Sequence, residues 1–168
     1  AALLTKFRTR YRWPFDIGVA AVVVSFMVLT FQQSLVWKDT EDLFRNVTRH
    51  YPNAHIAHIN LGYLHYERGE REEALSEFEQ ALLIRPSQLG YHNVGLLTSE
   101  MNRHEESLIA HLKALEINPD SVDELVNVGI EALATGKLEQ AEMALKRGLS
   151  LDPTRNLARE TLEEVRRQ

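Results

Sequence analysis

Seven histidines are the side chains of this sequence best suited to metal binding or proton transfer. His55 and His58 are three residues apart, and His58 and His65 are seven apart, so one helix would place these imidazoles close enough to share a metal ion. However, His58, His65 and His111 stand where the repeat described below carries bulky packing residues. We therefore interpret them as packing residues and expect no metal and no cofactor.

The remaining polar residues form no recognisable catalytic group. The acids are spread over the chain, and no glycine-rich phosphate loop is present. There is no cysteine, which excludes disulfides and cysteine-ligated metals. The net charge of -5 argues against a general nucleic-acid binder, which would need a basic face. The sequence thus indicates a protein that is not an enzyme and does not bind nucleic acid.

A fixed period organises most of the chain. Proline recurs at intervals of 34, 33 and 34 residues, at Pro52, Pro86, Pro119 and Pro153. Glycine recurs 24 residues before each of the last three prolines, at Gly62, Gly95 and Gly129. A period in this range is typical of a repeat array.

The periodic pattern resembles the tetratricopeptide repeat (TPR), a pair of antiparallel helices that stacks into a superhelix. It places small residues at positions 8, 20 and 27 of each repeat, a bulky residue at position 24 (Phe78, His111 and Leu145) and proline at position 32. The resemblance covers about residues 38–168 and implies an all-α solenoid that binds proteins, without implying any reaction.

In this register, residues 38–54 form a degenerate half repeat, 55–153 three repeats, and 154–168 a polar-backed capping helix. We expect Asp39 to cap the half repeat's helix. We expect the turns within repeats to lie at Gly69, Asn102 and Gly136, in the left-handed conformation. Ser121 and Glu124 have the spacing of a capping box.

The resemblance implies that the first helix of each repeat forms a concave binding face. Position 6 on that face is asparagine in all three repeats, and in peptide-binding members of the family this amide hydrogen-bonds the ligand backbone. Alternatively, asparagine is simply the usual residue there. The lysines and arginine of the family's carboxylate clamp are absent, so the groove fits an apolar helix or strand better than a chaperone C-terminus. The predicted partner-binding residues are Asn60, Asn93, Asn127, Tyr63, Tyr66, Ile59, His92, Leu96, Val126 and Ile130.

The first 37 residues differ from the rest. Residues 1–12 form a basic flank, and residues 17–37 carry no charge. This length suits a bilayer, and Trp13 and Trp37 flank it as interfacial aromatics, so we predict a single transmembrane helix at 13–37. A cleaved signal peptide followed by a soluble array is the alternative, although no convincing cleavage site is present.

The charges at the two ends of this segment predict its orientation. The first 16 residues sum to +3, so the N-terminus is expected in the cytoplasm and the repeats in the periplasm or a lumen. Gly18, Ala21 and Ser25 share one helix face, a spacing that allows close packing on another membrane helix, or that reflects ordinary composition. The expected partners are membrane lipid, protein and a larger integral-membrane complex.

The junction of the two parts carries a second resemblance. The stretches Leu35-Val36-Trp37-Lys38-Asp39 and Tyr51-Pro52-Asn53-Ala54 are similar to the C-terminal part of transmembrane-and-TPR-containing O-mannosyltransferase-like proteins. The family's transferase part has no counterpart here, so no catalytic residue is carried over. Two hypotheses follow: a membrane-anchored TPR scaffold that serves as an auxiliary subunit, or the tail of a multi-pass glycosyltransferase whose repeats present acceptor proteins.

Overall fold

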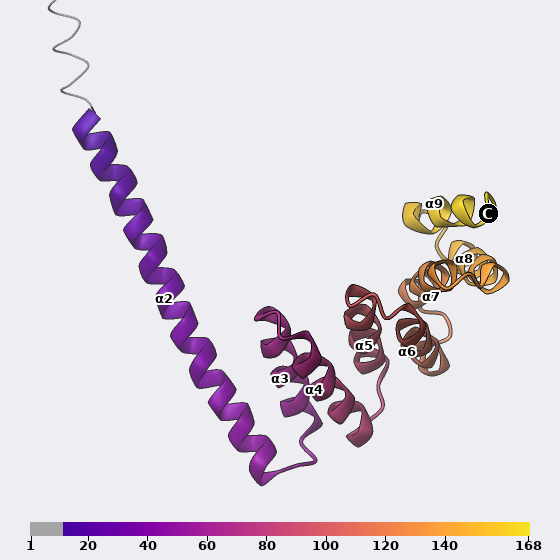
Figure 1. Ribbon diagram of the computed structural model, residues 1–168, viewed down its shortest axis with the longest axis horizontal. Coiled ribbons are helices and arrows are strands. Elements are labelled where there is room, and N and C mark those ends of the chain that lie inside the picture. The colour runs from indigo at the N-terminus through magenta and orange to yellow at the C-terminus, as the bar shows by residue number, and fades with distance from the viewer. Residues whose placement is uncertain (1–11) are drawn as a thin grey trace, which may run out of the picture. The chain divides into compact units, whose positions relative to one another are not determined.

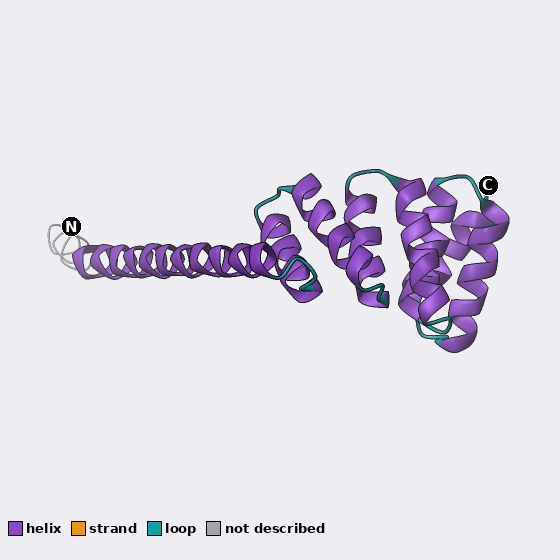
Figure 2. Ribbon diagram, turned by 90° about the horizontal axis from the view of Figure 1, so that it is seen from below, coloured by secondary structure: helices purple, strands orange, loops and turns teal. Residues whose placement is uncertain are grey.

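The computed structural model describes the backbone of residues 12–168 and the side chains of residues 18–32 and 40–168. It divides into two compact units, Ala1–Leu43 and Phe44–Gln168, which we treat separately. All regular elements in the described residues are α-helices (Figure 2). The basic flank predicted at 1–12 lies outside the described residues, apart from the backbone of Arg12.

One long helix is followed by three helix pairs and a final helix. Each pair joins a helix of 13 residues to one of 14, and all three pairs fall within the range 55–153 predicted for the repeats. The helices are α2 (Arg12–His50), α3 (His55–Glu67), α4 (Arg71–Ile84), α5 (Gln88–Glu100), α6 (His104–Ile117), α7 (Val122–Ala134), α8 (Leu138–Leu151) and α9 (Asn156–Val165).

The second unit is a stack of these pairs. Helix α3 packs with α4, α5 with α6, and α7 with α8, while α4–α5 and α6–α7 contacts join successive pairs (Figure 1). Helix α9 packs on α8 and α7 at the end of the stack. Its Ala158, Leu162 and Val165 are buried, as expected of a helix that closes an exposed solenoid end. The expected all-α solenoid is therefore confirmed.

The recurring glycines lie where the two helices of a pair approach most closely. A Cβ atom added at Gly62 would come within 2.6 Å of the Phe78 ring. At Gly95 it would come within 2.5 Å of the His111 ring, a distance that real Cβ contacts do not reach. The small residue at position 8 and the bulky residue at position 24 thus fill one space between them, which is the packing role predicted for both.

The turns within the repeats follow the prediction. Gly69, Asn102 and Gly136 adopt φ angles of 77°, 58° and 73°, in the left-handed region where glycine and asparagine are favoured. The amide of the next residue returns to the helix just completed, as where Arg103 N donates to Thr98 O at 2.8 Å. This hydrogen bond satisfies a carbonyl at the helix end and directs the chain into the second helix.

The half repeat does not begin where we predicted. Helix α2 runs without interruption from Arg12 to His50, so Asp39 lies inside a helix and is not an N-cap. No glycine or proline occurs between Gly18 and Pro52, and nothing in the backbone therefore favours a break. The boundary predicted between 37 and 38 is not a boundary between helices.

Within the stretches whose side chains are described, no helix combines the length and the apolar character needed to cross a bilayer. The transmembrane helix predicted at 13–37 is therefore not supported, and its end residues, 13–17 and 33–37, lie outside the described side chains.

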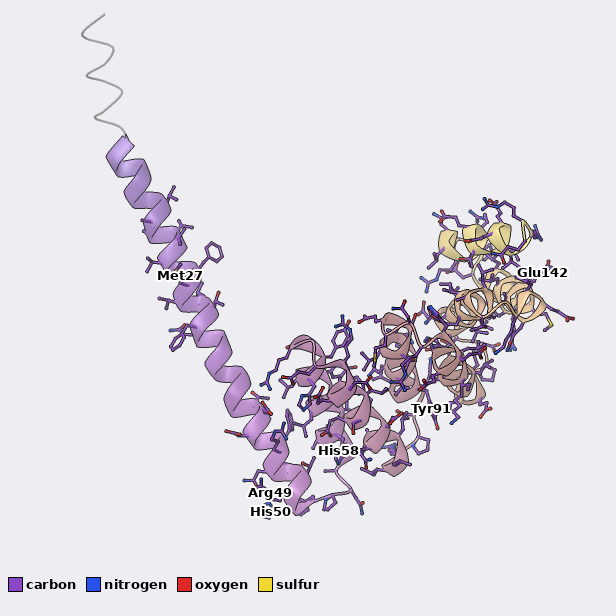
Figure 3. All side chains as sticks on the ribbon, in the orientation of Figure 1. Met27, Arg49, His50, His58, Tyr91 and Glu142 are labelled. Carbon is purple, nitrogen blue, oxygen red and sulfur yellow. The ribbon has the colours of Figure 1, made fainter. Side chains whose placement is uncertain are left out.

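The side chains of residues 18–32 are all exposed and project from α2 around Met27 (Figure 3). Two hydroxyls in this stretch bond to their own helix, Ser25 Oγ to Ala21 O and Thr30 Oγ1 to Phe26 O, each at 2.8 Å. This stretch also contains Gly18, Ala21 and Ser25, the three small residues predicted to pack on another membrane helix.

Candidate functional site

Helices α3 and α5 bring together four of the predicted partner-binding residues. Tyr63 and Tyr66 on α3 and Asn93 and Leu96 on α5 line a cavity of about 120 Å³. Phe78, Leu97 and Glu100 complete its wall. Tyr63 and Leu96 keep 40% and 43% of their surface exposed, so the cavity opens onto a solvent-facing apolar and aromatic surface.

Two hydrogen bonds across this cavity join the first repeat to the second. Asn93 Nδ2 donates to Tyr63 Oη at 2.7 Å, and Tyr66 Oη donates to Glu100 Oε1 at 2.6 Å. The hydrogen bond with Glu100 raises the pKa of Tyr66, and burial and the charge of Glu100 act in the same direction. The aromatic rings are therefore held in place, with one carboxylate at the edge of the cavity.

The three position-6 asparagines do not behave alike. Asn93 reaches across to the preceding repeat, whereas Asn60 Nδ2 donates to Ile56 O of its own helix at 2.7 Å. Asn127 is half-buried on α7. The three asparagines therefore recur with the sequence period, but their amide groups do not make the same hydrogen bond in each repeat.

Four further predicted residues contribute less to an open face. Val126 is only 4% exposed and belongs to the core, so its predicted place on the partner-binding face is wrong. Ile59 and Ile130 are half-buried against the two core clusters. The His92 imidazole is hydrogen-bonded to the buried Glu124 carboxylate. The accessible part of the predicted face is thus concentrated on α3 and α5.

A buried carboxylate lies between two imidazoles at the junction of α5, α6 and α7. Glu124 Oε1 accepts from His92 Nδ1, and Glu124 Oε2 accepts from His111 Nδ1, both at 2.7 Å. Glu124 and His111 are each 1% exposed. Burial raises the pKa of the Glu124 carboxyl, but the hydrogen bonds and charges of the two histidines together outweigh it, and the pKa is lowered.

The contact of Glu124 with His92 and His111 forms a polar bridge between helices. A second bridge of this kind is formed by residues seven positions away on each of the three helices. Glu131, also buried, accepts from Ser99 Oγ at 2.6 Å and from His104 Nδ1 at 2.8 Å. Residues seven apart lie on the same face of a helix, two turns from each other. Helix α7 therefore directs two buried carboxylates, Glu124 and Glu131, into the second repeat.

These bridges overturn the predicted capping box. Ser121 makes no side-chain cap hydrogen bond, and its hydroxyl accepts from Gln88 Nε2 at 3.1 Å. The carboxylate of Glu124 is committed to His92 and His111 instead. A serine and a glutamate three residues apart suit a cap locally, but here two imidazoles from other helices compete for the acid and provide its hydrogen-bond partners.

His92, His111 and Glu124 are the one group of three in the described part of the chain whose ligand atoms could hold a metal ion, with all of those atoms within 4.8 Å of one another. The trio considered from sequence is not gathered in this way. His58 Nδ1 pairs with Glu77 at 2.7 Å, and His65 Nδ1 pairs with Glu70 at 2.6 Å. The spacing of histidines along one helix could not predict the observed group, because its three residues come from three different helices.

The comparisons with known proteins agree with this fold. Residues 55–88 and 90–121 each match a family model described as tetratricopeptide repeat. These ranges coincide, within a few residues, with the helix pairs α3–α4 and α5–α6. The chain therefore carries tetratricopeptide repeats, as predicted.

Two curated relatives show how far the similarity extends. The chain is 30% identical over 119 residues to the peroxisomal targeting signal receptor of Candida albicans, an alignment that covers 68% of this chain and 20% of the receptor. It is 27% identical over 113 residues to the protein O-mannosyl-transferase TMTC2 of Homo sapiens, covering 62% of this chain and 14% of that protein. The chain thus spans a fifth or less of the length of these relatives.

Solved structures of similar fold include the crystal structure of MamA, with a TM-score of 0.72 and 15% identity over 81% of this chain and 80% of that one. The first TPR of Spaghetti (RPAP3), bound to an HSP90 peptide, superposes with a TM-score of 0.63 and 18% identity over 67% of this chain and 90% of that one. At these identities the similarity establishes the fold alone.

Proposed function

We propose that this chain is a non-catalytic scaffold that holds an apolar segment of a partner protein on the α3–α5 face. The observation that carries the proposal is the cavity lined by Tyr63, Tyr66, Asn93 and Leu96. Exposed aromatic and leucine side chains supply contact area, and the Asn93 amide and the Glu100 carboxylate supply hydrogen-bonding groups at its edge. Similarity to a TPR domain solved with an HSP90 peptide supports peptide binding in general.

A matched pair of leucines tests the location of this face. Peptides that bind the full chain would first be selected from a phage-displayed library. Their affinities for the wild type and for the Leu96→Ala and Leu83→Ala variants would then be measured by calorimetry. Both leucines are exposed, but Leu83 lies on α4, outside the cavity. We expect Leu96→Ala to weaken binding about tenfold or more, as for a central contact, and Leu83→Ala to leave it unchanged. The opposite pattern would show that the peptide binds the face that carries Leu83, on α4, and not the α3–α5 face.

We further propose that α2 anchors the array in a membrane, with the repeats on the extracytoplasmic side. The exposed apolar side chains between residues 18 and 32 support this, since a water-facing helix would carry a polar face. The internal hydrogen bonds of Ser25 and Thr30 also suit an apolar solvent, which offers no other partner to a hydroxyl.

The absence of native cysteine makes the topology directly measurable. A single cysteine placed at the exposed Ser150 would be labelled with a membrane-impermeant maleimide in intact cells or sealed vesicles. Labelling from the extracytoplasmic side, with the chain retained in the membrane after alkaline carbonate, is the expected result. Release of the chain by carbonate would rule out the proposed membrane anchor. Labelling from the cytoplasmic side alone would show that the orientation is opposite to the one proposed.

A second candidate function is the tail of a glycosyltransferase whose repeats present acceptor proteins. The similarity to TMTC2, of which this chain covers 14%, favours it, as does the resemblance at the junction of α2 and the repeats. Immunoblotting of the native polypeptide from its own membranes would decide between the two. A mass several-fold above 19.3 kDa favours the transferase, and a mass near that value favours a separate scaffold subunit.

A further inference from the structure

We propose that His92, His111 and Glu124 bind one transition-metal ion, best suited to Zn²⁺, at the junction of the second and third repeats. The three residues come from α5, α6 and α7, and their ligand atoms lie within 4.8 Å of one another. The site goes beyond the scaffold function, because residues of the repeats themselves form it and it needs no partner protein.

The donor set matches the chemistry of zinc. Two imidazole nitrogens and one carboxylate oxygen are a common zinc ligand set, which leaves a fourth position for water or another ligand. Calcium and magnesium prefer oxygen ligands throughout and are poorly served here. The histidine nitrogens favour zinc, copper or nickel among the divalent ions.

The dimensions of the cluster also allow an ion. The two Nδ1 atoms now lie 2.7 Å from the carboxylate oxygens. To bind an ion, each Nδ1 must give up the proton that it donates to Glu124, and the neutral imidazole then carries its proton on Nε2. Zinc bonds of about 2.0–2.2 Å in tetrahedral geometry place neighbouring ligand atoms roughly 3.3 Å apart. The two contacts with the carboxylate must therefore lengthen by about half an ångström, and any ligand atoms that lie as far as 4.8 Å apart must move closer together. Shifts of this size are within reach of side-chain rotation.

The exposure of the three ligands shows which one moves. The side chains of His111 and Glu124 are 1% and 2% exposed, and packing holds them in place. That of His92 is 27% exposed, so this imidazole faces solvent. His92 is thus the outer ligand, through which an ion enters, and the other two form a rigid base.

The neighbouring bridge provides a control within the same fold. Ser99, Glu131 and His104 repeat the arrangement seven residues along each helix, but a serine hydroxyl replaces the second imidazole. A neutral hydroxyl is a weak zinc ligand, and that bridge offers only two of the usual donors. Metal binding should therefore depend on the first bridge and be independent of the second.

The experiment uses the full chain in detergent, stripped with a chelator and titrated with ZnCl₂ by calorimetry and with CoCl₂ by visible absorption. We expect one site, the ligand-field bands of Co²⁺ bound with low coordination number, and a rise in Tm that grows with the metal concentration. His92→Gln should weaken Zn²⁺ binding about 100-fold and abolish the bands. His104→Gln should change neither.

Two outcomes would overturn the proposal. One is a wild-type chain without Co²⁺ bands, or with Zn²⁺ affinity equal to that of His92→Gln. The other is an equal loss in His92→Gln and His104→Gln, which would locate the ion elsewhere. His92 is partly exposed and glutamine can still donate a hydrogen bond to Glu124, so we expect His92→Gln to keep the fold. Far-ultraviolet circular dichroism of each variant checks this.

Discussion

His111 performs two tasks, only one of which is performed by the residues at the same position in the other repeats. At position 24, Phe78 and Leu145 only fill space beside a glycine, whereas the His111 ring fills the space beside Gly95 and also donates to Glu124. The sequence pattern predicts the first task, because position 24 must be bulky. It does not indicate the second, since the acceptor lies on the next repeat.

Close approach at Gly95 leads to a stability prediction. Gly95→Ala places a Cβ within 2.5 Å of the His111 ring, which is trapped between two helices and a buried acid. We expect a loss of about 1–3 kcal/mol in the free energy of unfolding, measured by urea denaturation. Gly148→Ala is the control, because its nearest neighbour lies 3.5 Å away and the alanine favours the helix. An unchanged free energy of unfolding in Gly95→Ala would mean that α5 and α6 can move apart at little cost.

The hydrogen bond from Tyr66 to Glu100 leads to a prediction about pKa. Glu100 raises the pKa of Tyr66, because ionising the phenol would lose the hydrogen bond and place two negative charges together. Glu100→Gln should therefore lower the pKa of Tyr66 toward its usual value. Ultraviolet titration of the wild type and the variant measures the difference, with Tyr66→Phe identifying which phenol is responsible. An unchanged titration would show that the two side chains do not meet in solution.

Helix α7 joins the third repeat to the second through buried polar contacts. It directs Glu124 and Glu131 into the preceding repeat, where four polar side chains hold them. A buried carboxylate needs such partners, because leaving it unpaired costs far more than the hydrogen bonds return. The two acids thus align α7 against α5 and α6.

Removing the second bridge tests this alignment. Glu131→Ala deletes the acceptor of Ser99 and His104, and we expect the free energy of unfolding to fall by about 1–3 kcal/mol. Glu139→Ala, at an exposed position of α8, should change it by less than about 0.5 kcal/mol. Equal effects of the two substitutions in thermal unfolding would contradict a structural role for the bridge.

The elements also show what a single sequence can predict. Helix pairs and left-handed turns follow from the proline and glycine period, because each repeat uses the same close contacts. The Asp39 cap and the Ser121–Glu124 box fail for the opposite reason. Both are short local motifs, and an uninterrupted helix in one case and two distant histidines in the other override them.

Across the array as a whole, the surface proposed to bind a partner could be predicted only in part. The period correctly brings Tyr63, Tyr66, Asn93 and Leu96 to one place, because they share the first-helix register. It cannot show that Val126 turns inward, since which flank of a helix is buried depends on the crossing of its neighbours.

Two truncations test how the stability of the array is distributed. A chain that ends at Asp152 lacks α9 and uncovers the core against which Leu162 and Val165 pack, so we expect a loss of about 3–6 kcal/mol. A chain that starts at Phe44 removes only the first compact unit and should keep the Tm of the repeats. Differential scanning calorimetry compares both with the full chain. A larger effect from the second truncation would contradict the division into two units.

The two junctions between repeats differ in a way that bears on how such arrays diversify. Links between the first and second repeats, such as those of Tyr66 with Glu100 and Arg103 with Glu72, lie near the surface, where water can replace a missing partner. The second and third repeats share Glu124 and Glu131, which are buried. Recombination at the first junction that keeps its shared apolar cluster would leave no buried acid without a partner, whereas shuffling the third repeat alone would leave two buried acids unpaired. We therefore expect that the last two repeats must be exchanged together if the chain is engineered.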